Sequence, residues 1–132
     1  MAFFKGLLGA AALAAAAGFG AQAQGAFAVM PTWDGITACN GRPISSPSPR
    51  FTVANAPVGT TQLEFKMTDL DAPQFTHGGG KVAYNGDGGV VAGAFKFIGP
   101  CPPSSHRYEW SVVARDAAGK SLGTAKAVIK YP

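Results

Sequence analysis

The sequence predicts an all-β protein, an antiparallel β-sandwich with few or no helices apart from an N-terminal export signal. Three observations support this fold class. No long amphipathic helical pattern occurs after residue 24. Apolar and polar residues instead alternate with a period of two, which is typical of half-buried strands. The 18 glycines and 10 prolines divide the chain at short intervals, as expected for short strands joined by turns.

The first element, residues 1–23, predicts a secretory signal peptide. Lys5 precedes a short apolar run at residues 6–19, and Ala21-Gln22-Ala23 forms a small-x-small cleavage site. The alternative is a membrane anchor, but the run is shorter than the roughly 20 residues that a spanning helix needs. We therefore expect cleavage after Ala23, no transmembrane segment after cleavage, and a single periplasmic or secreted domain at residues 24–132.

The clearest predicted strands lie in the second half of the chain. Residues 63–68 carry apolar side chains at every second position, and residues 107–115 show the same alternation. A turn signal at residues 116–120 separates the latter from a further alternating segment at residues 121–130. These last two segments therefore predict a β-hairpin.

Four other segments are weaker strand candidates, and two are predicted loops. The weaker strands are at residues 26–30, 50–53, 81–84 and 90–97. Residues 41–49 are rich in Ser and Pro, and residues 99–105 begin with a Gly-Pro-Cys-Pro-Pro run. Proline restricts both its own backbone and that of the preceding residue, so each segment predicts a stiff, extended loop.

The two cysteines and the charges exclude several function classes. Cys39 and Cys101 form an even pair in an exported chain, which predicts one disulfide rather than two free thiols. The cysteines and the two histidines lack zinc-finger spacing, so no metal site is predicted. The basic residues are scattered, which argues against a nucleic-acid partner. The net charge of +4 is compatible with anionic ligands or lipid headgroups.

The residues that can carry chemistry lie near predicted strand ends. Asp69 and Asp71 directly follow the strand at residues 63–68, and His106 directly precedes the penultimate strand. His77 stands before three glycines. Binding sites on sandwiches are usually placed in such loops. Each residue also has a structural alternative: the aspartates as turn formers, His106 as a partner of Asp69, and His77 as a solvated loop residue.

Three motifs, in order along the chain, resemble signatures of the phosphatidylethanolamine-binding protein family. Residues 46–60 contain Ser-Pro and Ala-Pro-x-Gly-Thr elements similar to the family's lead-in. Residues 69–73, Asp-Leu-Asp-Ala-Pro, resemble its D-P-D-A-P motif. Residues 99–103, Gly-Pro-Cys-Pro-Pro, followed by His-Arg-Tyr at 106–108, resemble G-P-x-P-P and H-R-Y. The similarity covers about residues 39–132 and is strongest to the bacterial members, the relatives of Raf kinase inhibitor protein.

The resemblance implies a fold of antiparallel sheets with a small anion pocket at one end. Transferred motif by motif, the residues implied to bind ligand are Asp69, Gly99, Pro100, His106 and His77. The resemblance further implies that Asp71 and Pro73 shape the adjoining loop. Imidazoles near a carboxylate can donate charge-assisted hydrogen bonds to phosphate. A rigid Gly-Pro loop could aim backbone N–H groups at the same oxyanion.

Two departures from the family pattern affect this pocket. Leu70 stands where the family has a proline between the aspartates. The residue after His77 is glycine rather than tryptophan, and Gly78, Gly79 and Gly80 together predict a flexible loop that holds His77 loosely.

The function predicted from these features is a non-enzymatic binding protein for a phosphate-type group, such as a phospholipid headgroup, without a cofactor. The alternative is a protein-interaction or inhibitor module acting on a kinase or protease. A hydrolase is the weakest hypothesis because the chain has no G-x-S-x-G nucleophile motif.

Overall fold

The computed structural model describes residues 25–86 and 88–132, so the predicted signal peptide lies outside the described residues. This part of the chain contains strands and no helix, and nothing in it resembles a membrane-spanning helix. The strands are β1 (Ala28–Pro31), β2 (Ser45–Pro47), β3 (Phe51–Ala54), β4 (Gln62–Asp69), β5 (Thr76–Ala83), β6 (Lys96–Ile98), β7 (His106–Arg115) and β8 (Ser121–Tyr131). The predicted all-β fold class is confirmed.

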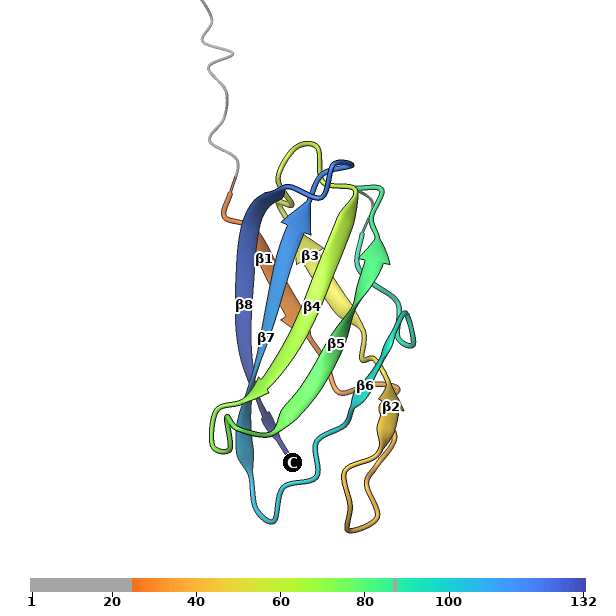
Figure 1. Cartoon of the computed structure of the whole chain (residues 1–132), viewed down its shortest axis with the longest axis vertical. Helices are drawn as coiled ribbons and strands as arrows, with labels where there is room; N and C mark the ends of the chain where they lie inside the picture. Colours follow the sequence, from red (N-terminus) through yellow and green to blue (C-terminus); the bar gives the residue numbers. More distant parts are fainter. Residues whose placement is uncertain (1–24, 87) are drawn as a thin grey trace, which may run out of the picture.

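The strands form three antiparallel sheets arranged as a sandwich (Figure 1). The four-stranded sheet has the order β5-β4-β7-β8, and β7 and β8 form the predicted hairpin. The pairs β1-β3 and β2-β6 make two small sheets. Figure 1 shows β1 and β3 behind the four-stranded sheet, with β2 and β6 beyond its β5 edge.

Aromatic side chains fill the space between the layers. Phe51 of β3 is fully buried, with its ring centroid 4.6 Å from that of Phe65 on β4 and 5.0 Å from that of Trp110 on β7. The alternation predicted for β4 and β7 is therefore confirmed, because their apolar positions form this core. Burial of this kind stabilises a domain by about 25 cal/mol for each Å² of apolar surface removed from water.

The predicted flexible glycine loop was wrong, because Gly78, Gly79 and Gly80 lie inside β5. Gly80 is opposite Phe65, and a Cβ at Gly80 would lie 2.5 Å from the Cβ of Phe95. A Cβ at Gly79 would overlap the carbonyl oxygen of Phe65. These glycines therefore allow close packing against a neighbouring strand and an aromatic ring, which is one of the uses of glycine within a strand.

Other boundaries also differ from the prediction. The strand expected at residues 90–97 is reduced to β6, and Val90 forms only an isolated bridge with Phe51. Part of the predicted Ser/Pro loop forms β2, where Ser46 pairs with Phe97. Proline has no N–H group to donate to a neighbouring strand, but at a strand end or a sheet edge this hydrogen bond is not required. A Pro-rich segment can therefore supply a short edge strand.

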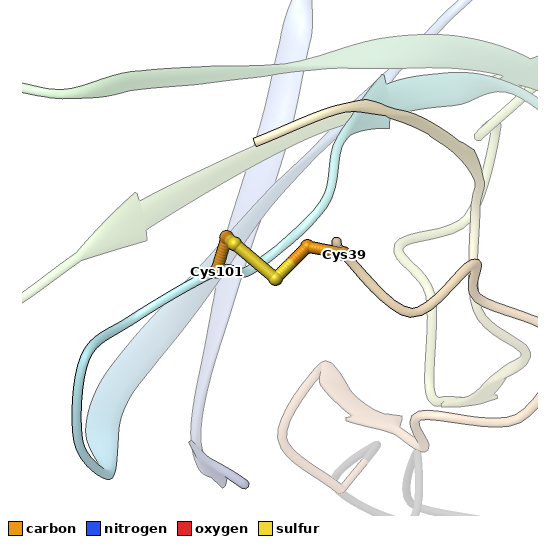
Figure 2. Close-up of a disulfide and its surroundings, with 2 residues drawn as sticks. All are labelled: Cys39 and Cys101. Atoms are coloured by element: carbon orange, nitrogen blue, oxygen red, sulfur yellow. A yellow bond between two sulfur atoms is a disulfide. The ribbon is translucent and has the colours of Figure 1, made fainter. Parts of the chain in front are cut away.

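The predicted disulfide is confirmed. Cys39 and Cys101 are bonded, with their Cα atoms 5.6 Å apart. Figure 2 shows the bond joining the segment before β2 to the segment after β6. It therefore connects the two proline-rich segments near the candidate site. Disulfides are typical of proteins outside the reducing cytoplasm.

Candidate functional site

Asp69, the last residue of β4, is the centre of the candidate site. Its Oδ2 accepts a hydrogen bond from Nδ1 of His106 at 2.7 Å. Its Oδ1 accepts from the backbone N–H groups of Asp71 at 2.9 Å and Ala72 at 3.1 Å. Asp69 is only 4% exposed. It therefore forms the turn after β4 and orients His106 at the same time. The two structural alternatives from the sequence, Asp69 as a turn former and His106 as its partner, both describe these contacts.

Asp71 fastens this turn to the start of β7. Its Oδ2 accepts from the Arg107 backbone N–H at 2.7 Å, and its Oδ1 accepts from the Arg107 guanidinium at 3.1 Å. These hydrogen bonds, the backbone one first, lower the pKa of Asp71. Pro73 lies exposed in the same turn. The contacts of Asp71 agree with a loop-shaping role.

His77 is buried rather than loosely held, so that expectation from the sequence was wrong. It is 3% exposed, and its Nδ1 lies 2.7 Å from the carbonyl oxygen of Ile98 on β6. The ring centroid lies 4.6 Å from that of Phe75 and 5.6 Å from that of Tyr108. Burial lowers the pKa of His77, while the Ile98 hydrogen bond and the charge of Asp69 oppose this effect.

A β-bulge places His77 on the inner face of the sheet. Gly79 pairs with Lys66 and Thr76 with Thr68, so β5 has one more residue than β4 in this interval. Gly78 has a φ of 74°, a conformation that favours glycine. In a strand without the extra residue, His77 would face outward, because Gly80 faces the core and side chains alternate. The bulge reverses that direction.

These side chains line one cavity of about 150 Å³. Its polar side chains come from Asp69, His77, His106 and Tyr108. The remaining lining residues are apolar or belong to the disulfide: Pro43, Ala72, Phe75, Cys101, Pro102 and Pro103. Small-molecule sites commonly have this composition, with apolar walls and a few polar groups that converge.

Gly99 and Pro100 are not brought into the cavity. Both are buried, and the N–H of Gly99 donates to the carbonyl oxygen of Ile44 at 2.9 Å. The N–H group expected to face an oxyanion is therefore already used to hold the loop. The following residues, from Cys101 to Pro103, form the cavity wall instead.

Tyr108 lines the cavity but was not among the ligand-binding residues expected from the sequence. It is 1% exposed, pairs with Asp69 across β4 and β7, and lies on the same face as His106. Burial, followed by the charge of Asp69 and a hydrogen bond to it, raises the pKa of Tyr108. Tyr108 therefore stays a neutral phenol. Its position two residues after His106 was the signal that could have identified it.

Metal binding has no support in the described residues. They contain no group of three or more His, Cys, Asp or Glu side chains placed to hold an ion. The polar groups that line the cavity are the carboxylate of Asp69, two imidazoles and a phenol.

His77 gives a testable effect of pH on stability. The pKa of a histidine is 6.5 before folding and is lower in the folded protein, so the unfolded chain binds more protons between these two values. The stability contributed by neutral His77 is thus present above pH 6.5 and is lost as the pH falls through this window. His77→Asn, which can keep a donor toward Ile98 but does not titrate, should lose less stability than wild type between about pH 7.5 and 5. Urea unfolding of both proteins at the two pH values measures this, and equal losses would contradict it.

Comparison with solved structures shows the fold. A putative phosphatidylethanolamine-binding protein homolog from Chlamydia trachomatis, CT736, matches with a TM-score of 0.56 and 18% identity, covering 81% of this chain and 97% of that one. YbcL of E. coli, described as a new member of the mammalian family, matches with a TM-score of 0.53 and 18% identity, covering 80% and 97%. No family model and no curated protein matches the sequence. The chain thus has the fold of phosphatidylethanolamine-binding proteins, as its motifs indicated.

Proposed function

We propose that this protein binds a small phosphate-type anion, such as a phospholipid headgroup or a phosphorylated metabolite, in the cavity beside Asp69. The observation that carries the proposal is the hydrogen bond of 2.7 Å between Asp69 Oδ2 and His106 Nδ1. It commits one ring nitrogen to the protein and leaves Nε2 of His106 for a ligand. When the ring is protonated, Nε2–H becomes a charge-assisted donor backed by a carboxylate.

The size and lining of the cavity support a small ligand. Its volume of about 150 Å³ is several times the ~30 Å³ that one water occupies in the liquid. Pockets for drug-sized molecules are larger, roughly 300–1,000 Å³. A headgroup therefore matches the cavity better than an acyl chain does.

We propose binding without catalysis. Asp69 is not available as a general base, because it already accepts from His106 and from two backbone N–H groups. The same bonds hold His106 in a fixed orientation, which suits a binding site. Incubation of the protein with a chromogenic phosphate ester should give no turnover above the rate in buffer.

Two substitutions of His106 test the binding site. His106→Asn can keep a donor toward Asp69 but removes the ligand-facing nitrogen, so phosphate affinity should fall about ten- to a hundredfold, the worth of a charge-assisted hydrogen bond. His106→Gln can place a neutral donor near the position of Nε2 and should lose less. Calorimetric titration with phosphate and phosphoethanolamine at pH 6 measures both.

Lys126→Ala is the control for a lost positive charge, because Lys126 is exposed on β8 and contacts Glu109 rather than the cavity. It should bind phosphate like wild type. Equal affinity of wild type and His106→Asn would refute the anion site and leave the protein-interaction module as the alternative.

We also propose that the domain acts outside the cytoplasm as residues 24–132. The Cys39–Cys101 disulfide supports this compartment. N-terminal sequencing of protein recovered from cells should begin at Gln24. Recovery of the chain with Met1 intact would contradict export by cleavage.

A further inference from the structure

The two histidines of the cavity have different partners on the same ring nitrogen. Nδ1 of His106 lies 2.7 Å from a carboxylate oxygen of Asp69. Nδ1 of His77 lies 2.7 Å from the carbonyl oxygen of Ile98. A backbone carbonyl only accepts, so Nδ1 of His77 must carry the hydrogen. In the neutral ring, Nε2 of His77 then holds a lone pair and is an acceptor.

The surroundings of His77 favour its neutral form. It is 3% exposed and lies between the rings of Phe75 and Tyr108. The titratable groups around it are Asp69 on β4, His106 and Tyr108 on β7, and Lys96 on β6, which lines a hollow with His77 on the other side. Asp69 already has His106 and two backbone N–H groups as partners. The net effect of this environment is a lowered pKa for His77.

With His106 protonated, the cavity therefore presents a donor at Nε2 of His106 and an acceptor at Nε2 of His77, both near the phenol of Tyr108. The ring centroids of His77 and His106 lie 5.6 Å and 6.3 Å from that of Tyr108. His106 can donate to an anionic oxygen, whereas His77 needs an O–H group opposite its lone pair. An anion without a proton could place only an oxygen lone pair opposite Nε2 of His77. The two lone pairs would repel each other, and the buried nitrogen would have no hydrogen-bond donor.

We propose, on the basis of the anion site above, that the cavity selects oxyanions that carry a proton, such as the monoanions of phosphate and phosphomonoesters, over fully deprotonated oxyanions and diesters. His77 is the residue that determines this specificity. The protonated oxygen of the ligand donates to Nε2 of His77, and an ionised oxygen accepts from Nε2 of His106.

Sulfate and phosphate provide a matched test, because they are similar in size and shape but only phosphate keeps a proton at pH 6. Calorimetry should show phosphate binding at least about tenfold more tightly than sulfate. Methyl phosphate should exceed dimethyl phosphate in the same way, which separates phosphomonoesters from the diester of a lipid headgroup. His77→Gln, whose amide can turn to donate, should bring the phosphate-to-sulfate ratio close to one. His106→Gln should weaken both anions and keep the ratio.

The outcomes separate this inference from the proposed function. If phosphate and sulfate bind equally and both depend on His106, the anion site stands and the selectivity is wrong. If neither binds wild type, both proposals fail. Should thermal melting show that His77→Gln is unfolded, titrations of wild type with phosphate and with sulfate in buffers of different ionisation enthalpy decide instead. At pH 8, where phosphate is mostly a dianion, phosphate binding should take up about one proton more than sulfate binding does, and equal uptake by the two anions would overturn the selectivity.

Discussion

Replacing Cys39 and Cys101 with serine should lower the free energy of unfolding by about 4 kcal/mol. The bond closes a loop with a sequence separation of 62 residues, and in the chain-entropy model a loop of this length restricts the unfolded state by roughly that amount. Small domains have a total stability of only about 5–15 kcal/mol. Urea unfolding of the double variant and of the wild type, compared at pH 7, measures the difference.

The disulfide should also affect ligand binding, because Cys101 lines the cavity and the bond ties Pro102 and Pro103 to the segment that carries Pro43. Without the bond, two sides of the cavity lose their covalent connection, so phosphate affinity should fall even under conditions where the variant is fully folded. Cys39→Ser alone should match the double variant, since either substitution breaks the bond. Wild-type stability in the double variant would show that the loop contributes little to the unfolded-state entropy.

The Asp69–His106 pair was accessible from the sequence because both residues lie at the ends of clearly alternating strands. Asp69 ends β4 and pairs with Tyr108 on β7, which puts His106, two residues earlier, on the same face as Tyr108. The motifs therefore agreed with the strand pattern, and the geometry followed from the pairing of β4 with β7. What the sequence did not contain was the register of that pairing, which depends on contacts far apart in the chain.

The hydrogen-bond partner of Gly99 was likewise not accessible from the sequence. A motif indicates that a loop is present but not which acceptor each N–H group meets. The N–H of Gly99 donates to the carbonyl oxygen of Ile44, a residue in a segment that the sequence predicted to be a stiff, extended loop. That segment forms β2 with β6. Short strands held by distant partners have too little local pattern to be recognised.

The three glycines of β5 show the same limit more clearly. Local preference favours a flexible loop for Gly78, Gly79 and Gly80, whereas packing requires a strand with no side chain at Gly79 and a positive φ at Gly78. Tertiary contacts with Phe65 and Phe95 therefore override the local preference. The departure from the family's sequence after His77 does not remove the histidine from the cavity.

Substitution of these glycines should consequently have graded effects on stability. Gly79→Ala should cost about 2–4 kcal/mol, because the new Cβ overlaps the carbonyl oxygen of Phe65 and only movement of the backbone relieves the overlap. Gly78→Ala meets no atom within 4 Å but is held at a φ of 74°, which costs about 1–2 kcal/mol. Gly123→Ala on β8 is the control, because its Cβ would meet only side-chain carbons, of Pro57 at 3.1 Å and of Phe27 at 3.8 Å. It should change stability by less than about 1 kcal/mol.

Urea unfolding of the three variants should give the order Gly79→Ala, Gly78→Ala, Gly123→Ala from least to most stable. The first two should also weaken phosphate binding while folded, because Gly78 belongs to the bulge that turns His77 inward and Gly79 fixes the distance between β5 and β4. Gly123→Ala should leave binding unchanged, since Gly123 is remote from the residues that line the cavity. If Gly79→Ala were as stable as wild type, residues 78–80 would have to be a flexible loop after all. His77 would then lack the fixed orientation on which its role as an acceptor depends.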